Sequence, residues 1–238
     1  MAADAAAAVV AAGAAVAKPR VLLVAPRDSY RTAPYIAAAR KQGVDLLIAS
    51  EGKLALSGLD LPGVQVSLPD APGSLQAVLT AAQEQPFVGI IGTDDASTEL
   101  AVLASMHLQL PHNPLLSVRL ARRKDLSRAH LERAGVPVPR HWKIDLTSPL
   151  APQLMHVSFP CVVKPVALSA SRGVIRADDC VQLEQAIGRI ASMLAEVPER
   201  EERETLLIEE FISGTEVAVE GLLGDGHLEI LTIFDKPD

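Results

Sequence analysis

From Arg20 onward, short apolar runs alternate with stretches of helical periodicity, and this alternation constrains the fold more than any other feature of the chain. Runs with strand character span 21–25, 45–49, 64–68 and 87–92, and runs with helical character span 33–42, 74–85 and 96–106. Strands that alternate with helices form a parallel sheet covered by helices. We therefore predict a Rossmann-like α/β lobe over residues 20–115. No Gly-x-Gly-x-x-Gly follows the first run, which disfavours a dinucleotide-binding domain.

Polar residues follow two of these predicted strands, at 26–28 and at 93–95. The carboxyl ends of strands in an open α/β sheet are where ligands bind. Asp95 also suits the N-cap of the helix that follows, and we favour that capping role.

Prolines mark the exit from this lobe at 110–114 and a stiff extended link at 135–139. A strongly basic helix is predicted over 119–133, and a solvated charged face is the default interpretation of such a helix. We place the boundary after residue 115 and assign 116–238 to a second domain. Residues 1–19 are rich in alanine and predict a flexible leader. They do not suit a secretory signal, because no Lys or Arg precedes the apolar stretch and Asp4 interrupts it.

The run FPCVVKPVALSASRGV, residues 159–174, joins an apolar strand to a lysine and a loop of small residues. We predict a strand over 159–163, with Lys164 at its end and Pro165 stopping the ladder. In the loop, small side chains let backbone N–H groups approach an anion, and Gly173 permits backbone angles that bulkier residues resist. This combination suits a polyphosphate, and a plain hairpin turn is the alternative on local grounds.

A second segment, residues 206–223, predicts two strands that meet at acidic residues. Glu209 and Glu210 lie at the exit of the first strand, a turn follows at 213–214, and Glu216 opens the second strand. A carboxylate in such a place can accept hydrogen bonds from ribose hydroxyls.

The order of these motifs resembles the ATP-grasp superfamily, in particular the carboxylate-amine ligases related to D-alanine ligase, bacterial L-amino acid ligases and carnosine synthase. The four motifs are RRKDLSRAHLERAGVPVPR (122–140), VVKPVALSASRGV (162–174), EEFISGTEVAVEG (209–221) and IFDKPD (233–238). The resemblance implies an α/β fold, with an N-terminal pre-ATP-grasp lobe followed by an incomplete α+β ATP-grasp domain. That domain would hold the first subdomain and the start of the second.

Carried over by position, the resemblance implies that Lys124 and Lys164 contact nucleotide phosphates. A loop would close over the β- and γ-phosphates, and its implied ATP-binding residues are Ser169, Ser171, Arg172, Gly173 and Val174.

The resemblance also assigns a segment that reads and sandwiches the adenine, formed by Glu209, Glu210, Phe211 and Ile212. Glu216 matches the carboxylate that holds the ribose. Lys236 resembles a family lysine near the phosphates or the substrate and is the one catalytic candidate. Phe211 and Ile212 suit ordinary core positions equally well.

The implied activity is ATP-dependent and uses Mg²⁺. The γ-phosphoryl group passes to a small-molecule carboxylate, and an amine then attacks the acyl phosphate. In the family, the metal ligands and a phosphoryl-steadying arginine come from strands that would follow Asp238, so we assign no metal ligand here. We expect the chain as written to bind nucleotide weakly and to turn over little or nothing. A non-catalytic nucleotide-binding module and a bicarbonate-using ATP-grasp carboxylase stay open as alternatives.

Composition predicts a cytoplasmic globular protein, since 49% of 238 residues are hydrophobic and can bury a sizeable core. A net charge of −7 and 3% aromatic residues argue against a nucleic-acid partner. No apolar stretch suits a membrane span. Cys161 reads as a small core residue, and the 6 histidines show no metal-ligand spacing. Family members often form dimers, which leaves a homodimer open.

Overall fold

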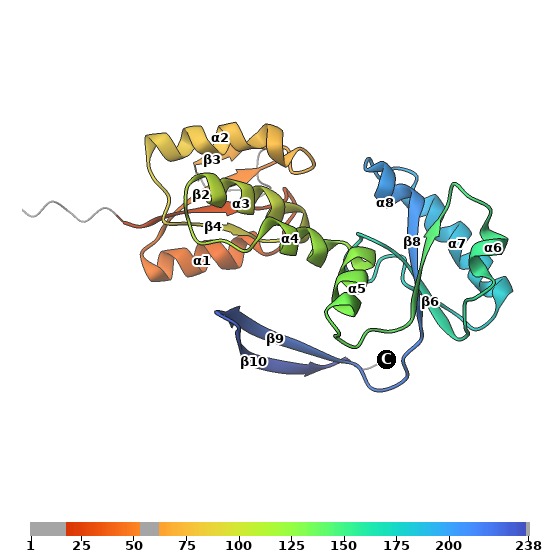
Figure 1. The fold of residues 1–238 in the computed structure, drawn as a ribbon. Helices are drawn as coiled ribbons and strands as arrows, with labels where there is room; N and C mark the ends of the chain where they lie inside the picture. Colours follow the sequence, from red (N-terminus) through yellow and green to blue (C-terminus); the bar gives the residue numbers. More distant parts are fainter. Residues whose placement is uncertain (1–17, 53–61, 237–238) are drawn as a thin grey trace, which may run out of the picture. The chain divides into compact units, whose positions relative to one another are not determined.

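The computed structural model describes residues 18–52 and 62–236, and it divides the chain into two compact units, Met1–Arg122 and Arg123–Asp238 (Figure 1). The boundary expected after residue 115 lies at the first residue of a helix, α4 (Leu115–Arg122), and stays a prediction. Nearly all of the expected leader lies outside the described residues.

The first unit is the expected α/β lobe. Its elements are β1 (Arg20–Val24), α1 (Thr32–Gln42), β2 (Asp45–Ser50), β3 (Gly63–Gln65), α2 (Ala71–Glu84), β4 (Gly89–Gly92), α3 (Asp95–His107) and α4. The four strands are parallel and lie in the order β3-β2-β1-β4. The run expected as a strand at 64–68 is only partly one, since β3 ends at Gln65.

Alternation along the central strand explains why both faces of this sheet are covered. Leu22 and Val24 belong to the core formed with α2 and α3, whereas Leu23 points to the other face and is also fully buried. Figure 1 shows α1 on the side of the sheet opposite α2. A strand that is buried on both faces reads as a continuous apolar run, as 21–25 does.

The second unit holds an antiparallel sheet and a separate hairpin. Its elements are α5 (Lys124–Arg133), β5 (His141–Asp145), α6 (Leu150–Leu154), β6 (Cys161–Pro165), β7 (Ile175–Ala177), α7 (Cys180–Leu194), α8 (Arg200–Glu204), β8 (Thr205–Glu210), β9 (Val217–Gly224) and β10 (His227–Asp235). The sheet order is β5-β8-β6-β7. Among the helices in the described part of the chain, none has both the length and the apolar content that crossing a bilayer requires.

The two faces of this sheet differ in chemistry. Leu206 and Ile208 of β8 pack with the apolar stripe of α7 into one core. Leu207 and Glu209 alternate with them and therefore face the other way, where α5 lies (Figure 1). Asp179 caps the N-terminus of α7, because its side chain accepts a hydrogen bond from the Gln182 N–H at 2.9 Å. One face thus builds the core and the other carries charge.

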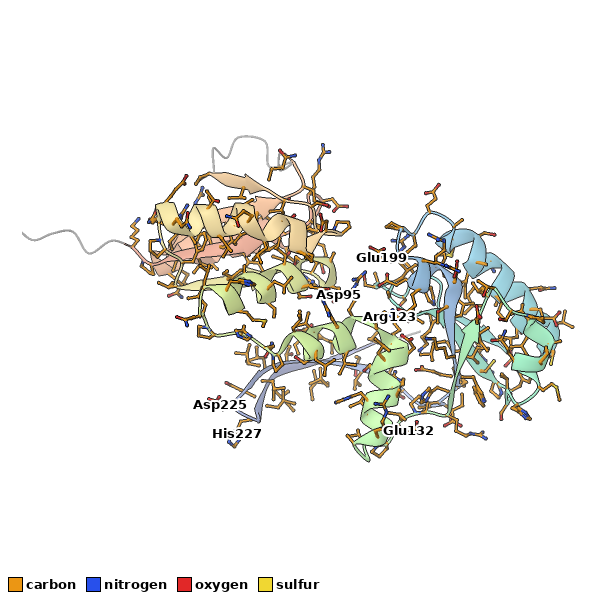
Figure 2. The ribbon with its side chains drawn as sticks, turned by 45° about the horizontal axis from the view of Figure 1, so that its top comes forward. Asp95, Arg123, Glu132, Glu199, Asp225 and His227 are labelled. Carbon is orange, nitrogen blue, oxygen red and sulfur yellow. The ribbon has the colours of Figure 1, made fainter. Side chains whose placement is uncertain are left out.

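The hairpin of β9 and β10 turns at Asp225 and Gly226, whose φ angles are 50° and 78°. Two consecutive residues with positive φ form the type I′ turn that Asp-Gly favours. Figure 2 labels Asp225 and His227 at the tip. Nearly every described residue of both strands is exposed, including Leu223 and Phe234.

Predicted elements were also wrong in the charged segments. The helix expected over 119–133 is two helices, interrupted at Arg123, whose backbone is extended. The charged segment that follows α7 contains a short helix, α8. The cap of α3 is Asp94 rather than Asp95: the Asp94 N–H donates to Ser97 Oγ at 3.0 Å, and Asp95 is the first helical residue.

Candidate nucleotide-binding site

Lys164 and Glu209 come together because β6 and β8 are neighbours in the sheet. Lys164 lies opposite Leu207, so Glu209 is its diagonal neighbour on the same face. The Lys164 amine donates a hydrogen bond to Glu209 Oε2. The strand was expected to end at 163, but it continues through Pro165. Strand β7 pairs only as far as Val163, so Pro165 has a ladder partner on one side alone, where a residue without an N–H is tolerated.

Glu209 is a buried carboxylate shared by two cations. Only 5% of the residue is exposed. Oε1 accepts a hydrogen bond from Arg128 Nε at 2.6 Å, and Oε2 accepts one from Lys164. Burial by itself would raise the pKa of Glu209, but the hydrogen bonds and charges of Lys164 and Arg128 outweigh it, and the pKa lies below its ordinary value. The carboxylate therefore stays ionised between its two partners.

Lys124 is the first residue of α5, and it contacts the backbone that follows Lys164. Its backbone N–H donates to the Val166 carbonyl at 2.8 Å, and its amine donates to the Leu168 carbonyl at 2.7 Å. Leu168 immediately precedes the loop 169–174. The structure therefore brings Lys124, Lys164 and the start of that loop to one end of β6, as the sequence motif requires.

The loop 169–174 has the conformation of a tight turn with left-handed residues. Ala170, Ser171 and Gly173 have φ angles of 54°, 56° and 73°. The Arg172 N–H donates to the Ser169 carbonyl and the Val174 N–H to the Ser171 carbonyl, each at 3.2 Å. A Cβ added at Gly173 would lie 2.9 Å from Pro165 Cγ, so this glycine lets the loop pack directly on the end of β6.

The predicted adenine segment follows Glu209, and its residues have separate surroundings. Glu210 points to the opposite face and accepts hydrogen bonds from Arg140, from its N–H at 3.1 Å and from Nε at 2.9 Å. These bonds lower the pKa of Glu210. The Phe211 ring lies 4.3 Å from the Arg176 guanidinium, and Ile212 is 69% exposed. Glu209 and Glu210 therefore do not form a paired acidic site.

Glu216 and Lys236 form an ion pair at the open end of the hairpin. The Lys236 N–H also donates to the Glu216 carbonyl at 3.1 Å. These two predicted site residues thus contact each other, whereas Lys164 contacts Glu209. The roles assigned to all of these side chains stay predictions.

Arg128 is the residue of this cluster that the sequence prediction missed. It lies four positions after Lys124 in α5, which places both on one face of the helix, and that spacing is the signal that would have indicated it. A helix of many charges hides such a signal, since most of its side chains are solvated.

A second buried network also escaped prediction. Arg123 donates to Asp125 through Nε at 3.0 Å and Nη2 at 2.9 Å, and to Glu201 of α8 through Nη1 at 3.1 Å. Lys143 of β5 lies 3.7 Å from Asp125 Oδ2. Arg123 and Asp125 are both under a tenth exposed, at 8% and 5%. Figure 2 labels Arg123 at the start of α5 and Glu132 near the helix's other end. This network ties the start of α5 to β5 and α8.

Part of the chain matches the model of a known family. Residues 157–238 match the model of the ATP-grasp domain. A D-alanine–D-alanine ligase of Afipia carboxidovorans is 29% identical over 192 residues, which is 77% of this chain and 58% of that enzyme. The chain therefore spans little more than half the length of this relative.

Two solved structures share the fold. The L-amino acid ligase from Bacillus licheniformis aligns with a TM-score of 0.69 and 23% identity, over 91% of this chain and 50% of that one. The ADP complex of N5-carboxyaminoimidazole ribonucleotide synthetase aligns with a TM-score of 0.70 and 12% identity, over 93% of this chain and 55% of that one. The likeness in fold therefore covers both the α/β lobe and the second unit.

Proposed function

We propose that this chain supplies the nucleotide-binding part of an ATP-dependent carboxylate-amine ligase, because residues 157–238 match the ATP-grasp domain and the chain is similar to a D-alanine–D-alanine ligase. The observation that carries the proposal is the meeting of Lys124, Lys164 and the start of loop 169–174 at one end of β6. Two lysines beside a loop of small residues suit the triphosphate of ATP.

In this proposal Lys164 and Lys124 hold the phosphates, and the loop residues Ser169 to Val174 cover them. The adenine lies against the chain at 209–212, and Glu216 accepts the ribose hydroxyls. Fixed cations and loop N–H groups stabilise the negative charge of the transferring phosphoryl group, which is the main source of catalysis in such reactions. The phosphoryl group would pass to a carboxylate and give an acyl phosphate, which an amine then attacks. Lys236 is proposed to lie near the reacting groups.

Magnesium would neutralise charge on the phosphates when bound. Within residues 18–52 and 62–236, no three or more Asp, Glu, His or Cys side chains gather to hold a metal ion. We therefore assign no step of the reaction to a metal held by these residues. The proposed location of the protein is the cytoplasm, and a homodimer is the proposed assembly.

The sequence relatives favour amino acids as substrates, since the matched relative is a D-alanine–D-alanine ligase. The fold likeness to N5-carboxyaminoimidazole ribonucleotide synthetase keeps a carboxylase as the second candidate. Product analysis decides between them. ADP release that depends on amino acids supports the ligase, and release that depends on bicarbonate supports the carboxylase. Nucleotide binding with neither dependence would favour the non-catalytic binding module for this chain.

A further inference from the structure

Glu209 is flanked by more positive charge than it can neutralise. Its side chain is 6% exposed, that of Lys164 is 16% exposed and that of Arg128 is 28% exposed. Each carboxylate oxygen has a separate cationic partner. One negative and two positive charges leave the cluster with a net charge of +1, in surroundings where charges are weakly screened.

Arg128 gives this cluster its net positive charge. Lys164 and Glu209 alone would form a neutral pair, in which the amine is fully compensated by the carboxylate. The second cation on Oε1 leaves one positive charge uncompensated. A buried pair of zero net charge attracts an anion less than a triad that carries a net positive charge.

We propose that Arg128 is a positioning residue for nucleotide binding. It donates a hydrogen bond to Oε1 of Glu209, and the carboxylate orients the Lys164 amine through Oε2. The cluster then keeps a net positive charge that attracts the phosphates. This inference rests on the proposed function, because it assumes that Lys164 contacts a nucleotide phosphate.

The place of Arg128 in α5 adds a second, geometric part to this role. The same helix begins with Lys124, whose amine contacts the carbonyl that precedes loop 169–174. The bond from Arg128 to Glu209 therefore fastens α5 to β8 one turn after Lys124. Without Arg128, α5 and its Lys124 lose this link to β8. The charge of Lys164 is then fully compensated by Glu209.

The test is calorimetry with ATP on the full chain and on five variants, one of which is Lys164→Ala. Arg128→Gln is expected to weaken ATP binding about tenfold (~1.4 kcal/mol). Arg128→Gln/Glu209→Gln removes both charges, returns the net charge to +1 and is expected to bind ATP more tightly than Arg128→Gln. Arg128→Lys keeps the charge and is expected to bind within about threefold of the original chain (~0.65 kcal/mol). Arg133→Gln, at an exposed position of the same helix, is the matched control and is expected to bind as the original does.

Each outcome supports or overturns the proposal. Unchanged ATP affinity in Arg128→Gln overturns it, and so does a double variant as weak as the single one, because a purely structural role would not be rescued by removing Glu209. If Arg128→Gln fails to fold, Arg128→Lys decides: ATP binding within about threefold of the original supports the proposal, and weaker binding contradicts it. If the original chain and Lys164→Ala show the same response to ATP, the proposed function fails instead.

Discussion

Lys164 and Glu209 form a diagonal cross-strand pair on the face of the sheet that packs against α5. The buried carboxylate serves two cations on two different elements, one on β6 and one on α5. Glu209 therefore links the strand that carries Lys164 to the helix that carries Lys124.

Gly173 lies where any larger residue would be strained. A Cβ there would lie 2.9 Å from Pro165 Cγ, and φ is +73°. We expect Gly173→Ala to lower the free energy of unfolding by about 1–3 kcal/mol. Gly188 in α7 is the matched control, since a Cβ there meets nothing within 4 Å. Gly188→Ala is expected to stabilise by about 0.5–1 kcal/mol. Urea unfolding measures both, and equal effects of the two changes would contradict the account.

Arg123 is expected to matter far more for stability than an exposed arginine. Arg123→Met leaves the Asp125 carboxylate buried without its bidentate partner, and we expect a loss of about 3–5 kcal/mol. Arg200, whose side chain is 79% exposed, pairs with Glu204 in α8. Arg200→Met is expected to change stability by less than about 1 kcal/mol. Thermal unfolding of the two variants provides the comparison, and a small effect at Arg123 would argue against the buried network.

Glu209 is expected to make stability depend on pH in the acid range. Its folded pKa lies below the ordinary value of 4.5, so the ionised group stabilises the fold above pH 4.5. That contribution is lost as the pH falls below 4.5 through the folded pKa. The stability difference between the original chain and Glu209→Gln should therefore be largest above pH 4.5 and shrink below it. Urea unfolding over a pH series measures this difference, and a constant value would contradict the prediction.

The two cysteines are expected to differ in reactivity. Cys161 is fully buried, and burial, followed by the charges of Asp178 and Cys180, raises its pKa to about 11. Cys180 is exposed at the start of α7. Alkylation of the folded protein should modify Cys180 alone, and unfolding should release both thiols, because the thiolate is the reactive form. Mass spectrometry reads the modified peptides, and labelling of folded Cys161 would show that its strand is not in the core.

The apolar elements were predictable from the sequence because their periodicity follows from burial. The run at 21–25 reads as a strand buried on both faces, and the stripe of α7 reads as one covered helix face. The lysine before the small-residue loop was predictable for the same reason, since an apolar strand ends beside it.

The charged contacts were not predictable, because their partners are distant in sequence. Arg128 and Glu209 are 81 positions apart, and Arg123 and Glu201 are 78 apart. Nothing local distinguishes these arginines from solvated ones in a basic segment. The extended backbone at Arg123 likewise follows from the tertiary network and not from helix propensity. Tertiary contacts, which sequence periodicity does not report, decided both the break in the helix and the site cluster.

Calorimetric titration of ATP into the original chain, Lys164→Ala and Lys41→Ala tests whether Lys164 binds the nucleotide phosphates. Lys41 is an exposed lysine of α1 and serves as the matched control. We expect a Kd of about 1 μM or weaker (~8.2 kcal/mol or less) for the original chain. Lys41→Ala should bind ATP equally well, and Lys164→Ala should show no measurable binding. ATP affinity that survives in Lys164→Ala would contradict the assignment of this cluster to the nucleotide phosphates.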